Sequence, residues 1–446
     1  MERRSVLGLL ATTSGLIISG GCATNTTTAK RNHFYGAAPG TPGSLPNPSL
    51  APGTDTIPEI DHIVVVMLEN HSYDSILGML PRGDGFALGP GGVPTNTNPA
   101  PAGRVVHAFE MPTACQEMGK PVQTWNASHI QWDHGLNNGF VLSRSGYVAM
   151  GYWTGSTLPF TYALADTFPI GDRYFCSLLG QTYPNRRYLL AATSLGMVDD
   201  TSPLQGRPPR GTILEQLIAH GISWRNYYSS TSSIDVWLYL AENPKIPPNV
   251  VKIEQFYSDA QHGKLPAFSL VDPNFGTNSE ENPQDVQLGD AFLSGIVNAV
   301  MHGPNWDKTL LIWVYDEHGG YYDHVPPPPA VKPDNVAPEI KVPPDQPGSF
   351  DRYGFRVPMG VVCPYAKPNY VSTVVHDHTS ILKLIETKWN LPALTYRDQA
   401  ADNLLDFVDF KSAPAFLDPP RLSPPVSQFS CTPGDPGQIP PVGAVT

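Results

Sequence analysis

The strongest fold signal in the sequence is the apolar run IVVVML at residues 63–68. It is rich in β-branched residues and contains no polar one, which is typical of a strand buried on both faces of a parallel sheet. A second run of this kind, LLIWVY, occupies residues 310–315. These two runs predict two central, buried strands.

Shorter elements around these runs predict an α/β fold. Strands are expected at residues 223–228 and 268–271 and around 361–362, and helices at 212–220 and 286–301. Such alternation is typical of a mostly parallel central sheet flanked by helices. Because 40 of the 446 residues are Gly and 48 are Pro, the connecting loops are expected to be long and rich in both residues.

The charge balance argues against one class of partner. The chain has 28 Lys and Arg against 40 Asp and Glu, a net charge of −12 at pH 7, and no basic run. Binding to a nucleic-acid backbone requires clustered Lys and Arg, so nucleic acid is not expected as a partner. A substrate that contains phosphate remains compatible, because a bound metal ion can invert the local charge.

Both ends of the chain have the composition of segments outside the folded body. Residues 1–22 combine two arginines, an apolar stretch and a cysteine, which predicts an export signal peptide, and Cys22 is a candidate for lipid attachment. Residues 23–57 lack apolar periodicity and predict a flexible tether, and residues 413–446 predict a Pro-rich tail. We therefore expect one folded domain at residues 58–412, in a protein exported to the periplasm, the cell envelope or the medium.

Export makes disulfide bonds available to the cysteines that follow the signal. These are Cys115, Cys176, Cys363 and Cys431, and four cysteines allow three pairings. Their wide spacing contains no CxxC motif, so a cysteine metal site is not expected. The sequence leaves two interpretations open, two disulfides or buried thiols.

Polar pairs follow directly after the two central strands. Glu69 and Asn70 follow the first strand, and Asp316 and Glu317 follow the second. In an open parallel sheet, ligands collect at the carboxyl ends of the strands. Carboxylate and amide oxygens favour hard cations, so the four side chains predict a site for Mg²⁺, Ca²⁺ or Mn²⁺ rather than Zn²⁺.

A hydroxyl and four histidines are the candidates for catalysis. Thr182 precedes an expected helix at 188–194, where helix amides and the helix dipole stabilise an anion such as phosphate. It is a candidate nucleophile, activated if its oxygen also joins the metal. Imidazole titrates nearest to neutral pH, which makes loop histidines candidates for proton transfer. These histidines are His129, His134, His324 and His378.

Four motifs, taken in order, carry a resemblance to a known family. They are IDHIVVVMLENHSYD at 60–74, TYPNR at 182–186, YDEHGGYYDHVP at 315–326 and DHTSIL at 377–382. The chain resembles the bacterial phosphoesterase family, which includes secreted phospholipases C, plant non-specific phospholipases C and a group of acid phosphatases. The four motifs fall within residues 59–410.

The resemblance implies an alkaline-phosphatase-like α/β fold and metal-assisted hydrolysis of phosphoesters. Residue by residue, it implies that Glu69, Asn70, Asp316 and Glu317 hold the metal and that Thr182 is the nucleophile, through a phosphothreonine intermediate. The implied substrate is a phospholipid, whose phosphodiester bond is hydrolysed, and such a substrate implies contact with a membrane surface. The oligomeric state is left open.

Histidines of the family also have counterparts in this sequence. His129 and His378 match histidines near the phosphate, and His134 and His324 match two others. One departure stands at Asn282, where family members often carry a histidine before a proline. Since an amide cannot transfer a proton, protonation of the leaving group or substrate preference is expected to differ here.

Two other functions remain alternatives to a phospholipase C. The first is a phosphomonoesterase of the acid phosphatase type on the same fold, and the second is a binding lipoprotein that has lost activity. A phospholipase C needs an apolar entrance for the glycerol end of the lipid. Aromatic residues that either form such an entrance or pack in the core are Tyr147, Trp153, Phe160, Tyr321 and Tyr322.

Overall fold

A computed structural model describes residues 37–446 except 117–118, 202–205, 342–343, 430 and 432–439. The export signal predicted at 1–22, with Cys22, lies outside the described residues, as does the first part of the predicted tether. Among the described residues, no helix combines the length and apolar character needed to cross a membrane.

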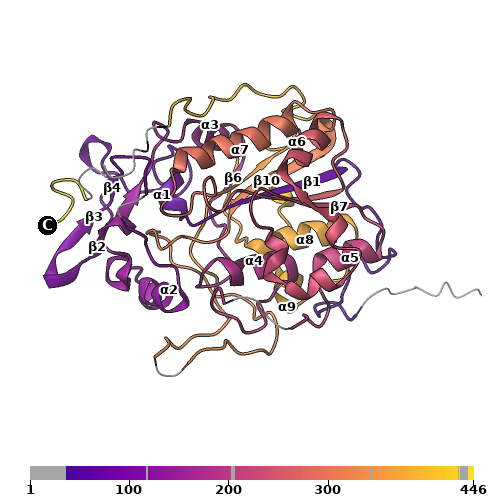
Figure 1. Cartoon of the computed structure of the whole chain (residues 1–446), viewed down its shortest axis with the longest axis horizontal. Helices are drawn as coiled ribbons and strands as arrows, with labels where there is room; N and C mark the ends of the chain where they lie inside the picture. The colour runs from indigo at the N-terminus through magenta and orange to yellow at the C-terminus, as the bar shows by residue number, and fades with distance from the viewer. Residues whose placement is uncertain (1–36, 117–118, 202–205, 342–343, 430, 432–439) are drawn as a thin grey trace, which may run out of the picture.

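An eight-stranded mixed sheet forms the centre of the molecule (Figure 1). In spatial order its strands are β12 (Val371–Ser372), β6 (Ile170–Gly171), β11 (Met359–Val362), β10 (Thr309–Tyr315), β1 (His62–Leu68), β9 (Phe268–Asp272), β7 (Trp224–Tyr228) and β8 (Val250–Lys252). The run from β10 to β8 is parallel throughout, whereas β11 is antiparallel to both of its neighbours. The predicted mostly parallel sheet is therefore confirmed, with β11 as an antiparallel exception.

The register of the two central strands places their ends together. β1 and β10 pair in parallel from His62 opposite Thr309 to Leu68 opposite Tyr315. Their carboxyl ends therefore stop at the same level of the sheet. The residues that follow, Glu69 and Asp316, leave the sheet side by side.

Helices cover both faces of the sheet. In Figure 1, α3, α6 and α7 lie on one face, and α4, α5, α8 and α9 lie on the other. The bounds of the helices are α1 (Tyr73–Leu77), α2 (Trp125–Trp132), α3 (Pro159–Thr167), α4 (Thr182–Ala191), α5 (Ile213–Ala219), α6 (Ile253–Gln261), α7 (Val286–Met301), α8 (His378–Lys388) and α9 (Tyr396–Ala400). The helices predicted at 212–220 and 286–301 correspond to α5 and α7. The helix predicted at 188–194 is misplaced, because α4 begins six residues earlier and ends where Ala192 adopts a left-handed conformation, with φ of 56°.

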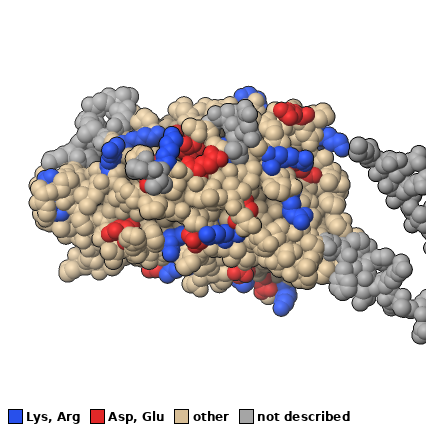
Figure 2. Space-filling model, turned by 90° about the horizontal axis from the view of Figure 1, so that it is seen from below, with Lys and Arg blue, Asp and Glu red and all other residues tan. Residues whose placement is uncertain are grey.

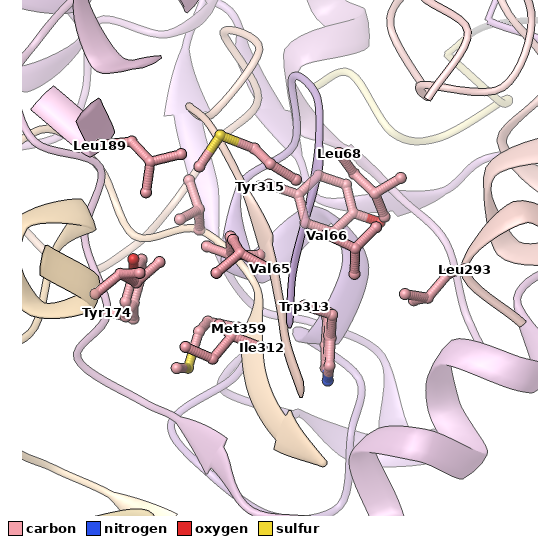
Figure 3. Packing of buried hydrophobic residues seen from close by; sticks show 14 of the residues in the cluster. Val65, Val66, Leu68, Tyr174, Leu189, Leu293, Ile312, Trp313, Tyr315 and Met359 are labelled. Carbon is pink, nitrogen blue, oxygen red and sulfur yellow. The ribbon is translucent and has the colours of Figure 1, made fainter. Parts of the chain in front are cut away.

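The apolar runs of the sequence form the core between these layers. Val64, Val65, Ile312 and Trp313 have no exposed surface. Figure 3 shows Val65, Ile312 and Met359 from three neighbouring strands gathered in one cluster. Burial of such side chains is the dominant favourable term in folding, so the two runs that predict the fold also stabilise it.

The described part of the predicted tether lies on the folded body. The Gly43 amide donates to the Ala393 carbonyl over 2.7 Å, and the Thr56 amide donates to the Lys388 carbonyl over 2.7 Å. The side chains of Leu45 and Ile57 are buried. Residues 37–57 therefore pack against α8 and the segment that follows it, mainly through backbone hydrogen bonds that apolar periodicity does not reveal.

A side lobe beside the sheet receives the end of the chain. It contains the strand pairs β2 (Thr97–Pro99) with β3 (Val105–His107), and β4 (Phe109–Glu110) with β5 (Gly151–Tyr152). Thr446 exchanges two backbone hydrogen bonds with Val105, of 2.8 and 2.9 Å.

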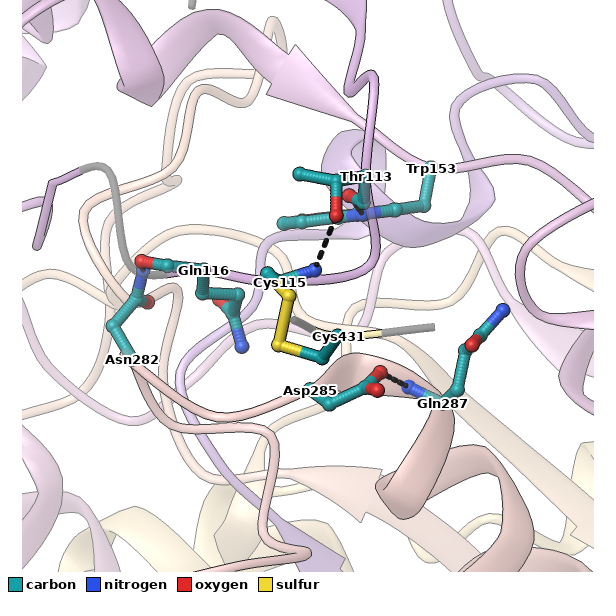
Figure 4. The surroundings of a disulfide bond; sticks show 8 residues. All are labelled: Thr113, Cys115, Gln116, Trp153, Asn282, Asp285, Gln287 and Cys431. Atoms are coloured by element: carbon teal, nitrogen blue, oxygen red, sulfur yellow. Dashed lines mark hydrogen bonds between the residues drawn. A yellow bond between two sulfur atoms is a disulfide. The ribbon is translucent and has the colours of Figure 1, made fainter. Parts of the chain in front are cut away.

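A disulfide bond links the lobe to the C-terminal segment. Cys115 is bonded to Cys431, whereas Cys176 and Cys363 are free and buried (Figure 4). The outcome lies between the two interpretations, with one disulfide and two buried thiols. Cys115 also pairs with Asp285 in an isolated β-bridge, so the bond holds the end of the chain against the segment that precedes α7.

Cys431→Ser is expected to lower the free energy of unfolding by about 2–4 kcal/mol, because the disulfide restricts the unfolded chain. Urea unfolding of the oxidised protein measures the loss. Cys115→Ser should cost the same, and the double variant should cost no more than either single one, since all three lack the same bond. Additive losses would contradict this account.

Candidate active site

Four predicted metal ligands converge where β1 and β10 end. Glu69, Asn70, Asp316 and Glu317 are each at most 3% exposed. The backbone amides of Asn70 and Glu317 both donate to Oδ1 of Asp316, over 3.2 and 2.7 Å. Asn70 adopts a left-handed conformation, with φ of 66°, which turns the chain away from the strand at this point. The expectation that the two polar pairs meet at one sheet edge is therefore confirmed.

Arg186, on α4, binds three carboxylates around this edge. Its Nε lies 3.0 Å from Oδ2 of Asp316, its Nη1 lies 3.2 Å from Oδ1 of Asp272, and its Nη2 lies 3.6 Å from Oε1 of Glu69. All four side chains are at most 4% exposed. Sequence analysis did not assign Arg186 a role, although it stands in the TYPNR motif. One guanidinium therefore neutralises only part of the acidic charge.

The carboxylates retain strongly shifted pKa values despite Arg186. Burial, reinforced by the nearby charge of Asp316, raises the pKa of Glu69 and that of Glu317 well above the ordinary range. Burial also raises the pKa of Asp316 to about 6, although Arg186 opposes this shift. Groups whose charged form is so poorly solvated bind a cation favourably, because the cation supplies the missing compensation.

Unpartnered oxygen atoms at this edge are available to a cation. Oε2 of Glu69 and Oε1 of Glu317 are buried and have no hydrogen-bond partner among the residues that the structure describes. Oδ1 of Asn70 accepts a hydrogen bond from Gln123 over 3.3 Å. Buried carboxylate oxygens without partners are costly unless a proton or a metal ion binds them. Oxygen donors alone favour Mg²⁺, Ca²⁺ or Mn²⁺.

A second acidic cluster lies apart from this edge. One potential ligand atom from each of Asp74, Asp323 and His324 lies within 4.8 Å of the others. Arg356, which has no exposed surface, already pairs with Asp74 over 3.0 Å and with Asp323 over 2.9 Å. Because an arginine and a histidine compensate its charge, we interpret this group as a buried ion-pair network.

Thr182 and Glu69 line one cavity of about 250 Å³, which we call the Thr182 cavity. Thr182 is the first residue of α4 and is 9% exposed. Arg186 lies one helical turn further along and lines the same cavity. The predicted nucleophile, one predicted metal ligand and the arginine thus share one solvent-accessible space.

Three further acidic residues line the Thr182 cavity and were missed by sequence analysis. They are Asp200, Asp235 and Glu281. Oδ1 of Asp200 accepts the amide of Tyr183 over 2.7 Å, at the beginning of α4. Isolated loop carboxylates carry no sequence signal that separates a cavity wall from an ordinary surface.

His378 contacts the site through the backbone. Its Nε2 lies 2.6 Å from the carbonyl oxygen of Asp316, and its Nδ1 lies 3.2 Å from the hydroxyl of Tyr174. Burial lowers the pKa of His378 to about 4. The ring is therefore neutral at pH 7, donates from Nε2, and supports the end of β10.

His129 and His134 line a different cavity, of about 360 Å³, beside α2. Nδ1 of His129 lies 2.7 Å from the Trp125 carbonyl oxygen, and burial lowers its pKa to about 4. His134 is exposed. Among the described residues that line the Thr182 cavity, neither histidine appears. The structure therefore does not bring this predicted pair to Thr182.

His324 belongs to the ion-pair network. Its Nδ1 lies 2.8 Å from Oδ2 of Asp74, and its Nε2 lies 3.3 Å from Oδ1 of Asp84. Burial alone would lower the pKa of His324, but the hydrogen bond and charge of Asp74, with the charge of Asp323, raise it to about 9. The imidazole is therefore charged at neutral pH.

The shifted pKa of His324 predicts a pH-dependent stability. Because the folded-state pKa exceeds the unfolded value of 6.5, the stabilisation is complete below about pH 6.5 and is lost as the pH rises through about 9. The loss is on the order of 3 kcal/mol. Urea unfolding at pH 6 and pH 10 should show it in the wild type and not in His324→Gln. Equal pH dependence in both proteins would contradict the assignment.

Asn282 turns inward beside the cavity rather than lining it. Its amide donates to the Gly119 carbonyl and to the Tyr321 hydroxyl, over 3.1 Å each. Its neighbour Glu281 lines the Thr182 cavity instead. Figure 4 shows Asn282 beside Gln116, near the Cys115–Cys431 bond.

The aromatic residues considered for an apolar entrance pack in or against the core. Trp153, Phe160 and Tyr321 are at most 1% exposed, and Tyr322 is 8% exposed. Tyr147 is half-buried against the same cluster. The entrance interpretation is therefore wrong for the four buried residues, and Tyr147 packs against the same core.

Comparisons with known proteins identify the family of this chain. The family model described as the Phosphoesterase family matches residues 60–392. Phospholipase C A of Mycobacterium tuberculosis is 31% identical, over 88% of this chain and 82% of that protein. Non-specific phospholipase C3 of Arabidopsis thaliana is 29% identical, over 79% of this chain and 74% of that protein.

Solved structures that match include a protein in the alkaline phosphatase superfamily from Vibrio parahaemolyticus. It is 13% identical, with a TM-score of 0.37 over 74% of this chain and 76% of that chain. The match of the family model over most of the chain, together with relatives at about 30% identity, determines the family. This chain is a member of the phosphoesterase family and a hydrolase of phosphoester bonds.

Proposed function

We propose that the protein is an exported, metal-dependent phospholipase C that hydrolyses the phosphodiester bond of phospholipids with Thr182 as its nucleophile. The observation that carries this proposal is the Thr182 cavity. It combines a hydroxyl at a helix N-terminus with Glu69, at an edge of buried, incompletely compensated carboxylates. The names of the relatives support the choice of a phospholipid as substrate.

The residues proposed to hold the metal are Glu69, Asn70, Asp316, Glu317 and Thr182. A divalent cation bound there would polarise a phosphoryl oxygen and lower the pKa of a coordinated hydroxyl. Arg186 contributes by fixing the carboxylates of Glu69 and Asp316 in position. Ca²⁺, Mg²⁺ and Mn²⁺ are favoured over Zn²⁺ by the oxygen donors.

In the proposed reaction, Oγ1 of Thr182 attacks phosphorus and the bond to the glycerol oxygen breaks. The proton of the Thr182 hydroxyl passes to a neutral histidine, which then gives it to the departing glycerol oxygen, and diacylglycerol leaves. The helix dipole at the beginning of α4 favours the negative charge of the phosphoryl group, although the Tyr183 amide already donates to Asp200 and Pro184 has no amide hydrogen. Water then hydrolyses the phosphothreonine and regenerates the Thr182 hydroxyl.

His378 is the proposed proton donor of the first step. Of the four predicted histidines, His378 contacts the end of β10, through the Asp316 carbonyl. Because its ring is neutral at pH 7, His378 would first have to accept a proton, and it would then have to exchange its hydrogen bond to Asp316 for one to the departing oxygen. We therefore keep His378 as the candidate and regard His129, His134 and His324 as weaker ones.

Export is supported by the sequence of residues 1–22 and by one bond in the folded body. The Cys115–Cys431 disulfide fits an oxidising compartment.

The charge distribution fits a small or membrane-bound substrate better than nucleic acid. In Figure 2, basic and acidic residues are scattered side by side over a mostly uncharged face.

The proposal is tested with chromogenic nitrophenyl substrates, one a phosphocholine diester and one a phosphate monoester. We expect hydrolysis of the diester, abolished by a chelator and restored by Mn²⁺, Mg²⁺ or Ca²⁺. Faster hydrolysis of the monoester would indicate the acid phosphatase alternative. Hydrolysis of neither substrate by folded, metal-loaded protein would indicate a binding protein.

A further inference from the structure

A second cavity of about 250 Å³ lies next to the Thr182 cavity, and we call it the Trp237 cavity. Its walls are mainly apolar and come from one stretch of chain that contains three short 3₁₀ helices. These helices are η6 (Ser233–Val236), η7 (Leu238–Glu242) and η8 (Pro247–Asn249). The apolar lining residues are Ile234, Trp237, Leu238, Ile246 and Val250.

The helix η6 forms a wall between the two cavities. Ser233 and Val236 line the Thr182 cavity, whereas Ile234 lines the Trp237 cavity. Asp235 lines both, so the two spaces adjoin at this residue. The exposed carboxylate of Asp235 therefore stands at the border between the two cavities.

The residues at the bottom of the Trp237 cavity are buried, whereas a residue at its rim is exposed. Ile234, Trp237 and Ile246 are at most 5% exposed, whereas Leu238 is 44% exposed. The guanidinium of Arg187 lies 5.6 Å from the centre of the Trp237 ring, and its Nε donates to the Val236 carbonyl over 3.0 Å. The floor is thus fixed to α4, the helix that begins with Thr182.

We propose that the Trp237 cavity binds the glycerol end of the phospholipid, with the first methylenes of its acyl chains. The inference rests on the proposed function, because the bond that breaks when Thr182 attacks phosphorus is the one to the oxygen of that glycerol. The apolar part of the substrate must continue from the Thr182 cavity, and the Trp237 cavity is the adjoining apolar space. Its volume falls below the roughly 300–1,000 Å³ of a drug-sized ligand site, so the chain ends remain outside.

Two variants at the rim test this subsite. Leu238→Asp introduces a charge beside the apolar ligand, and Ala241→Trp fills the space, since Ala241 is an exposed lining residue. The control is Leu88→Asp, because Leu88 is 54% exposed and lines neither cavity. Calorimetry measures the binding of dihexanoylglycerol to each full-length protein, which requires no catalysis.

We expect both rim variants to weaken the binding of dihexanoylglycerol by about tenfold or more, and the control to leave it unchanged. In parallel, kcat/KM for dihexanoyl-glycerophosphocholine should fall by a similar factor, while that for glycerophosphocholine, which lacks acyl chains, should not. Equal binding in all four proteins, or none in the wild type, would overturn the subsite. Binding that responds as expected without hydrolysis of either ester would retain the subsite and reject the proposed function.

Discussion

Thr182→Ala is expected to reduce phosphodiester hydrolysis by roughly 10⁴- to 10⁶-fold, the range seen when an enzyme loses its nucleophile. The hydroxyl would form the covalent intermediate, and the methyl group of alanine offers no substitute. The change removes few contacts, because Thr182 stands at the first position of α4, with its side chain at the cavity. Circular dichroism and thermal unfolding should therefore match those of the wild type.

The Thr182 cavity supplies a matched control for this experiment. Thr231 lines the same cavity and is exposed, so Thr231→Ala removes an equivalent hydroxyl from the same space. We expect Thr231→Ala to retain activity within about tenfold and Thr182→Ser to retain part of it, since serine keeps the nucleophilic oxygen. If Thr231→Ala is inactive and Thr182→Ala is active, the nucleophile is assigned to the wrong residue.

Arg186→Met is expected to destabilise the metal-free protein by about 3–5 kcal/mol at neutral pH, because it leaves buried carboxylates without their cation. The affected groups are Glu69, Asp272 and Asp316, each at most 4% exposed. Urea unfolding in the presence of a chelator measures the loss. Added Mn²⁺ should recover part of it, since a bound cation compensates the same charges.

The next residue of α4 provides the control for Arg186. Arg187 has no exposed surface either, but neither of its Nη atoms has a hydrogen-bond partner in the described part of the chain, and burial lowers its pKa to about 10. Arg187→Met removes a poorly compensated charge and is expected to cost much less stability. Equal losses in the two variants would show that side-chain volume, not charge pairing, determines the effect.

The central sheet and the acidic edge were predictable from the sequence because each depends on local pattern. Strands buried on both faces must be continuously apolar, which marks β1 and β10 directly. The pairs that follow them, Glu69 with Asn70 and Asp316 with Glu317, are placed by the strands themselves. Once the two strands are parallel neighbours, their ends must meet.

The positions of the histidines and aromatic residues were less predictable because they depend on how segments outside the central strands pack together. His129 lies on α2, in the side lobe, and reaches a cavity that adjacency in sequence does not specify. The sequence around Trp153 and Tyr321 does not distinguish an aromatic residue that lines an entrance from one that packs in the core. The role of Arg186 could not be predicted, because its three carboxylate partners are distant in the sequence. Ion pairs between such distant residues leave no periodic pattern.

The pairing of β1 with β10 has a consequence for the timing of catalytic competence during folding. The Asn70 amide and the Asp316 carboxylate that it contacts are separated by 246 positions in the sequence. Contacts so distant form only after a long loop has closed, and the entropy of closure opposes each step before it. A nascent or partly unfolded chain can hold either strand without holding the acidic edge. The acidic edge, and with it the proposed metal site, therefore forms only once β1 and β10 have paired.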